Sequence, residues 1–168
     1  MRPVNLFVIA TTALYLAFTA TAFAQSLPNN KWFKVCEGKA YITEYRLSKH
    51  HVKFMIRNDP TIRDPILAIA PWWVGVDLPF GMTWQIDDGK SIRVPFLRCT
   101  EVACTAQVIL NDKYIAALRA GSVYHLGATR DGKNRVIDVP LKGFAAAYDG
   151  KQLMTLDEYV AAGGASNP

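Results

Sequence analysis

The chain has few cysteines, no long hydrophobic run beyond residue 25 and no block of like charges. The three cysteines and three histidines lack the paired spacing of a zinc site. The basic residues are spread along the sequence, whereas nucleic-acid binding needs a clustered basic stripe. The serine nucleophile elbow, HExxH, P-loop and dinucleotide fingerprints are absent. We therefore expect no nucleic-acid partner, no metal, no cofactor and no catalytic residues, and an enzyme is the minority interpretation.

The first 24 residues have the pattern of a secretory signal peptide. Arg2 precedes an apolar stretch from Leu6 to Phe18, Ala22–Ala24 supply the small residues of a cleavage site, and acidic residues are absent. We predict cleavage before Gln25, which places the protein in the periplasm or, as a secreted protein, at the cell surface. The alternative is an uncleaved segment that anchors the chain in the inner membrane, because its apolar stretch approaches the spanning length. With a formal net charge of +5, the surface is suited to weak association with anionic lipid or glycan.

Most of the remaining chain alternates between apolar and polar residues, which is typical of β-strands. Residues 31–57 predict three strands with turns at Gly38 and at 48–51, followed by a loop at 58–65. Further strands are predicted at 66–76 (interrupted at Pro71), 82–86, 91–99, 105–110, 122–130 and 134–141. The Asp-Gly turn at 88–89 should join 82–86 and 91–99 as a hairpin. Short strands at such spacing predict an all-β protein, an antiparallel β-sandwich.

One or two short helices are expected beside the strands. Asn111 is a good N-cap for a helix at 112–120 that ends at Gly121, and 143–150 predict one or two helical turns. Thr155 and Glu158 have capping-box spacing before a last short helix. The predicted organisation is a signal peptide at 1–24, one sandwich domain at 25–154, and a short C-terminal helix with a frayed tail at 155–168.

Cys99 and Cys104 lie five positions apart between two predicted strands. A zinc site would need more ligands at matched spacing, and a thioredoxin-like centre needs C-x-x-C at the start of a helix. Facing strands bring Cα atoms within the range of a disulfide. We therefore predict a structural disulfide. Cys36 is then left either as a free, buried thiol or as the site of an intermolecular disulfide, for example in a Cys36-linked dimer.

Other residues are candidate binding or catalytic groups. Trp72 and Trp73 are adjacent and cannot both face inward on one strand, so an exposed member would mark a binding surface. His50 and His51 are interpreted as a solvated turn, and Asp87 with Asp88 as ordinary hairpin residues. Two alternative functions follow: a glycan-binding module that uses the exposed tryptophan, or an envelope hydrolase.

Five segments in order carry a resemblance to a known family. They are GVDLPFG at 75–81, QIDDGK at 85–90, PFLRC at 95–99, LRAG at 118–121 and LKGFAAAYD at 141–149. With the second cysteine at 104, this combination resembles the invasion-associated locus B (IalB) family of exported bacterial proteins. The resemblance implies an exported β-sandwich of the cell envelope and supplies no catalytic residues. Members commonly carry another cysteine shortly after the position of Cys36, and this chain lacks it.

We therefore predict a non-enzymatic cell-envelope protein that acts through protein or surface contacts linked to host-cell interaction. The expected partner is an envelope or host protein.

Overall fold

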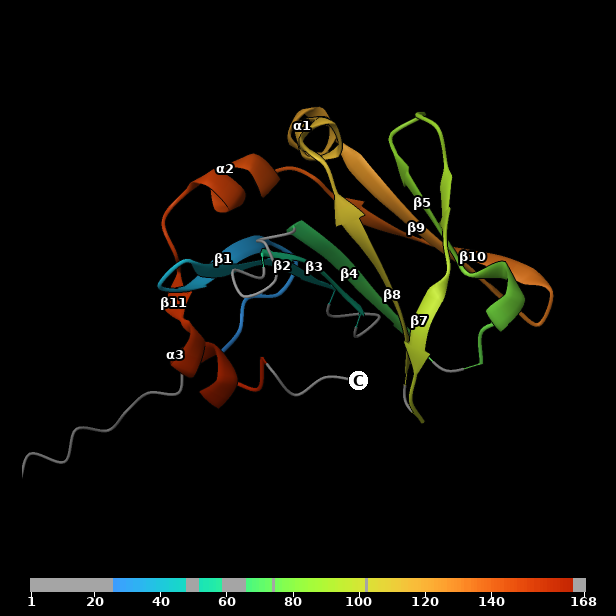
Figure 1. Cartoon of the computed structure of the whole chain (residues 1–168), viewed down its shortest axis with the longest axis horizontal. Helices are drawn as coiled ribbons and strands as arrows, with labels where there is room; N and C mark the ends of the chain where they lie inside the picture. The colour runs from blue at the N-terminus through green and yellow to red at the C-terminus, as the bar shows by residue number, and fades with distance from the viewer. Residues whose placement is uncertain (1–25, 48–51, 59–65, 74, 102, 165–168) are drawn as a thin grey trace, which may run out of the picture.

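The computed structural model describes residues 26–47, 52–58, 66–73, 75–101 and 103–164. Two sheets pack face to face, and three short helices lie around them (Figure 1). The elements in order are β1 (Trp32–Glu37), β2 (Ala40–Leu47), β3 (Val52–Asn58), β4 (Ile66–Trp73), the 3-10 turn η1 (Leu78–Phe80), β5 (Met82–Ile86), β6 (Ile92–Val94), β7 (Phe96–Cys99), β8 (Ala103–Leu110), α1 (Asp112–Ala120), β9 (Val123–Arg130), β10 (Lys133–Pro140), α2 (Phe144–Asp149), β11 (Met154–Thr155) and α3 (Leu156–Ala161).

One sheet has seven strands in the order β11-β1-β2-β3-β4-β8-β7, and the other has four in the order β10-β9-β5-β6. All neighbours are antiparallel except β1 and β11, which are parallel. The predicted all-β sandwich with few short helices is confirmed.

The alternation that predicted the first three strands divides their side chains between two faces. Tyr45 lies opposite Trp32 and packs into the core between the sheets. Its neighbour Glu44 lies on the outer face of the same sheet and is also fully buried. The outer face of this sheet is therefore covered too. The helix α3 covers it, and its Tyr159 hydroxyl donates to the Glu44 carboxylate.

Pro95 divides what the sequence predicted as one strand over 91–99. β6 ends at Val94 in the four-stranded sheet, whereas β7 begins at Phe96 in the seven-stranded sheet. Proline has no N–H to donate to a ladder, so it is suited to the point where the chain leaves one sheet for the other. The single-strand prediction is therefore wrong, and the segment links the two sheets.

The predicted interruption at Pro71 is also wrong. β4 continues through Pro71 to Trp73 and pairs with β8 along its whole length. β3 pairs only with residues 66–69 of β4, so Pro71 lies beyond the part of the strand that has partners on both sides. That position tolerates a missing donor.

Aromatic rings fill the space between the sheets. The Phe54 ring lies 4.8 Å from Tyr124, 5.9 Å from Trp84 and 6.1 Å from Trp32, measured between ring centroids. The Trp32 indole donates to the Pro140 carbonyl at 2.7 Å, which ties β1 to the end of β10. Tilted and edge-on ring pairs of this kind stabilise a core beyond their buried area.

The helices α1 and α2 close one side of the sandwich (Figure 1). As predicted, the Asn111 side chain accepts from the Tyr114 N–H at 2.9 Å and caps α1. Gly121 ends this helix in an extended conformation. Its lack of a side chain is required by packing, because a Cβ would lie 2.6 Å from Ile86.

A second, smaller hydrophobic cluster lies on the outer face of β1. Phe33 and Val35 pack there against Met154 and Tyr159. The predicted capping box of Thr155 and Glu158 is present at the start of α3. Across the described residues, no helix is long and apolar enough to cross a bilayer; the predicted signal peptide and its anchor alternative fall outside them.

Candidate functional site

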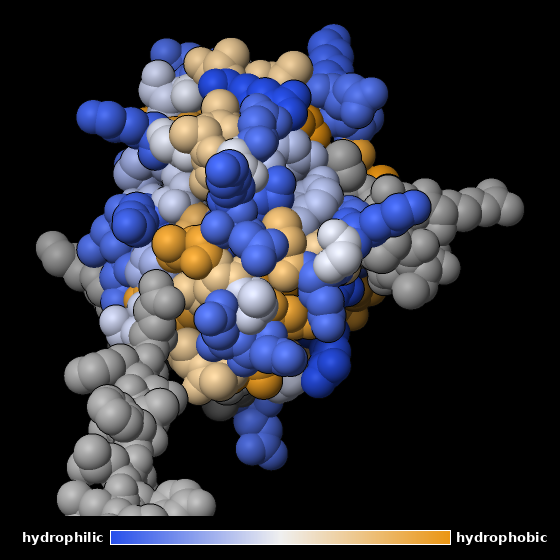
Figure 2. All heavy atoms as spheres, turned by 90° about the vertical axis from the view of Figure 1, so that its left-hand side faces the viewer, coloured by the Kyte–Doolittle hydropathy of each residue, from blue (hydrophilic) through white to orange (hydrophobic). Residues whose placement is uncertain are grey.

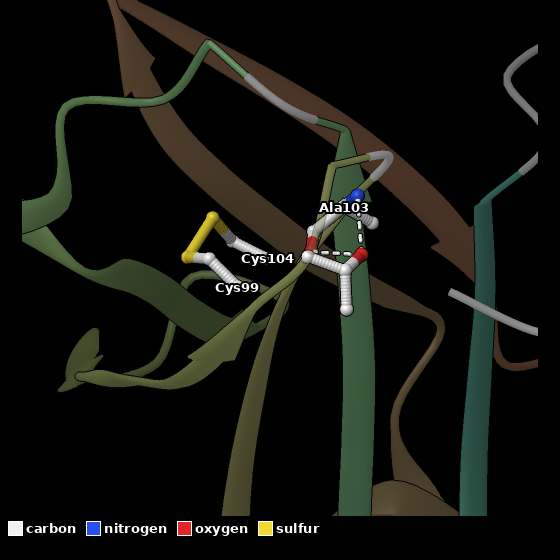
Figure 3. The surroundings of a disulfide bond; sticks show 4 residues. Cys99, Ala103 and Cys104 are labelled. Atoms are coloured by element: carbon white, nitrogen blue, oxygen red, sulfur yellow. Dashed lines mark hydrogen bonds between the residues drawn. A yellow bond between two sulfur atoms is a disulfide. The ribbon is translucent and has the colours of Figure 1, made fainter.

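The predicted pair Cys99 and Cys104 forms a disulfide at the tip of the β7–β8 hairpin (Figure 3). The Thr100 N–H donates to the Ala103 carbonyl at 2.8 Å, and the Ala103 N–H donates to the Thr100 hydroxyl at 3.2 Å. These bonds fix the turn that brings the two cysteines opposite each other. Within the described part of the chain, no three His, Cys, Asp or Glu side chains are grouped as a metal site would require.

Cys36 is a free, half-buried thiol in β1. It lies directly opposite Tyr41 of β2. Both residues line a small, mainly apolar cavity of about 210 Å³ at the end of this hairpin, together with Arg57 and Leu156. The predicted intermolecular disulfide therefore concerns a thiol that is only partly accessible.

Trp72 is not the surface residue that a binding platform would need. Its side chain is 7% exposed and belongs to the core between the sheets. The prediction of Trp72 as a binding surface is wrong, because the inward face of β4 carries it. The Trp73 backbone pairs with Ala103, and its side chain lies outside the described residues, as do His50 and His51.

Asp87, at the predicted hairpin turn, stabilises the fold through its side chain. Its carboxylate accepts hydrogen bonds from the backbone N–H groups of Ser122 at 2.9 Å and Val123 at 2.8 Å. These bonds hold the start of β9 beside β5. Asp88 is exposed.

A buried polar cluster lies under α3, and no pattern in the sequence predicts it. The Glu44 carboxylate accepts from the Tyr159 hydroxyl and pairs with the Arg46 guanidinium. Nearby, the Lys53 ammonium donates to the Gly164 carbonyl at 3.1 Å. Burial raises the pKa of Tyr159, and Glu44 adds to that shift; burial lowers the pKa of Lys53, against the opposing effect of Glu44. The cluster fastens the C-terminal segment to β2 and β3.

The face around β11 and α3 is mainly hydrophilic, with hydrophobic residues in small areas between polar ones (Figure 2). Leu153, which precedes β11, is 43% exposed, and Val160, which lies in α3, is 50% exposed. Scattered apolar residues of this kind are normal on a protein surface.

A more concentrated apolar segment is η1. Leu78 is 54% exposed and Phe80 is 49% exposed, and only one residue separates them. The segment is held firmly: the Asp77 carboxylate accepts from the Gly132 N–H at 3.0 Å, and a Cβ on Gly81 would lie 2.6 Å from the Val94 carbonyl. Two neighbouring exposed hydrophobic side chains on one turn make η1 a candidate contact surface.

Comparison with known proteins gives consistent matches. The family model for the invasion associated locus B (IalB) protein matches residues 34–152. Two invasion protein B homologs of Brucella abortus, one from strain 2308 and one from biovar 1 strain 9-941, are each 32% identical over 83 residues, which are 48% of this chain and 48% of the relative. The matched part thus spans about half the length of these relatives.

A crystal structure of invasion associated protein B from Bartonella henselae has the same fold. It superposes with a TM-score of 0.60 at 19% identity, covering 74% of this chain and 94% of that protein. Because the family model matches well over half of the chain, this protein belongs to the invasion-associated locus B family.

Proposed function

We propose that this protein is exported to the cell envelope and acts there without catalysis, by binding a protein partner of the envelope or of a host cell. The Cys99–Cys104 disulfide within the family domain is the observation that carries the proposal, because structural disulfides form and persist in oxidising compartments such as the periplasm. The names of the Brucella relatives, invasion protein B homologs, support a role in contact with a host.

The surface proposed for this contact is the η1 segment, represented by Leu78 and Phe80. Both side chains are apolar and exposed, and backbone hydrogen bonds from Phe80 to Asp77 and from Gly81 to Leu78 hold the turn that carries them. Preorganised apolar groups of this kind contribute to binding because little conformational entropy is lost.

The location is tested by fractionating cells that express the full chain. We expect the protein in the periplasmic or surface fraction, shortened at its N-terminus and with Cys99 and Cys104 resistant to alkylation until reduced. Full-length protein in the cytoplasm with both thiols free would overturn the proposal.

The contact surface is tested by crosslinking in intact cells. Changing Leu78 and Phe80 together to Asp should abolish one specific crosslinked partner, and Ile109→Asp, which alters a residue that is 68% exposed on β8, should retain it. A Cys36→Ser variant reveals whether the thiol adds a disulfide-linked species. Identical crosslinking patterns for the wild type and the double variant would rule out the η1 segment.

A further inference from the structure

A polar hollow of about 390 Å³ lies on the outer face of the four-stranded sheet. We call it the Gly127 hollow, and its lining includes Thr83, Gln85, Ser91, His125, Gly127 and Asn134. Its volume is within the range of small-molecule sites. No part of the disulfide, the η1 segment or the core lines it.

The strand register brings these side chains together. Thr83 lies opposite Gly127, and Gln85 lies opposite His125, in the pairing of β5 with β9. The alternate residues Trp84 and Leu126 are fully buried in the core. Since successive residues of a strand point to opposite faces, the hollow is on the solvent side.

Gly127 forms the floor of the hollow. A Cβ at this position would lie 2.2 Å from the Thr83 hydroxyl oxygen and 3.4 Å from the Asn134 side-chain oxygen. Two polar oxygens from different strands therefore converge above a backbone that has no side chain. A glycine within a strand often marks such a close approach.

The hydrogen-bonding groups in the hollow are available. Among the described residues, the side chains of Thr83, Gln85 and Asn134 make no hydrogen bond to another group. The His125 imidazole is oriented by the Asp138 carboxylate, whose Oδ1 lies 2.7 Å from Nδ1. Because that contact engages one ring nitrogen, the other is left to bind a ligand.

The lining selects the class of ligand. Beside two carboxylates, it contains hydroxyl, amide and imidazole groups, which both donate and accept, and among the described residues no lysine or arginine lines it. An anion would meet the Asp87 and Asp88 carboxylates, which are part of the lining. Val136, which is 54% exposed and lies opposite Gly127 on β10, offers an apolar contact. Hydroxyl groups that donate and accept, attached to a C–H framework, are the properties of a neutral saccharide.

We propose that the Gly127 hollow binds a neutral saccharide unit, from a bacterial envelope polysaccharide or from a host-cell glycan. This site differs from the tryptophan platform considered from the sequence, and it is independent of the η1 contact.

Binding is measured by NMR titration of the mature protein with two neutral probes. Chitotriose represents the bacterial source and N-acetyllactosamine the host source. We expect amide shifts confined to β5, β9 and β10, and a loss of affinity of about tenfold in Gln85→Ala and in Asn134→Ala, the effect of one lost hydrogen bond in a partly closed site. Binding of either probe supports the site, and the preferred probe identifies its source.

The matched control is Arg135→Ala, an exposed residue next to Asn134 on β10, which should bind as the wild type does. Circular dichroism verifies that each variant is folded. No binding of either probe, shifts that map elsewhere, or folded Gln85→Ala and Asn134→Ala variants that retain full affinity would each overturn the proposal.

Discussion

At the scale of single residues, Cys36 and Tyr41 repeat the arrangement of the disulfide-bonded cysteines. Both pairs are five positions apart, and in each the two residues lie directly opposite across an antiparallel hairpin. The Tyr41 N–H donates to the Asn58 side chain at 2.6 Å, so Cys36 and Tyr41 form a non-hydrogen-bonded pair, in which side chains lie close together. Tyr41 is thus the position at which a partner for Cys36 would fit.

A Tyr41→Cys variant should form a second intrachain disulfide. The wild type has one free thiol, Cys36, and the oxidised variant should have none when assayed in denaturant. The change also removes the 2.9 Å hydrogen bond between the Tyr41 and Tyr148 hydroxyls. Tyr41→Ser, which loses the same bond without adding a thiol, is the control. Two free thiols in the purified variant would contradict the predicted geometry.

At the scale of elements, the β7–β8 hairpin depends on its disulfide. Replacing Cys99 and Cys104 with Ser should lower the free energy of unfolding by about 2 kcal/mol, since the bond closes a short loop in the unfolded chain. Denaturant titration measures the loss, and the wild type in reducing agent should show the same value. Cys36→Ser, which breaks no disulfide, should change stability much less; an equal effect would show that the loss comes from removing thiols rather than the crosslink.

Elements with a local signature could be predicted from the sequence, and those defined by distant partners could not. The strands at 32–47 follow from alternation and α1 from its Asn111 cap. The division at Pro95 was missed because the residues on both sides have the same strand pattern, although they belong to different sheets. β11 is two residues long, too short to give a periodic signal.

The candidate sites follow the same rule. The cysteine spacing was sufficient to predict the disulfide, because both partners lie on one hairpin. The contact between Glu44 and Tyr159 joins residues 115 positions apart, and nothing near either residue indicates the other. Gly127 could have been recognised from the sequence, since an isolated glycine within a predicted strand suggests that another group approaches the backbone closely there.

At the scale of the whole molecule, buried tyrosines make the fold sensitive to alkali. Burial raises the pKa of Tyr45, Tyr114, Tyr124 and Tyr159. The stability that these shifted tyrosines contribute is fully present below a pH of about 10, the pKa of tyrosine in the unfolded chain. It is lost as the pH rises through the higher pKa values of the folded protein. The pKa of Lys53 is lowered in the folded protein, so this lysine makes stability rise with pH until the pH reaches its pKa in the unfolded chain. Its effect is smaller than the combined effect of the four tyrosines.

We therefore expect the thermal midpoint to fall steadily above a pH of about 10. Tyrosinate absorbance of the buried rings should appear together with unfolding. Tyr114→Phe, which removes one of the four shifted groups, should reduce the slope of stability against pH by about one proton. A variant slope equal to that of the wild type would contradict this origin of the alkaline loss.

The position of α3 also has a consequence for how the chain folds. Phe33 and Val35 emerge early in the sequence, but the residues that cover them, Met154 and Tyr159, come more than a hundred positions later. Contacts between distant segments form slowly because a long loop must close first. Until that closure, β1 presents an unpaired edge and an apolar outer face to its surroundings. A surface of this kind promotes self-association, so docking of β11 and α3 also protects the first strand from aggregation.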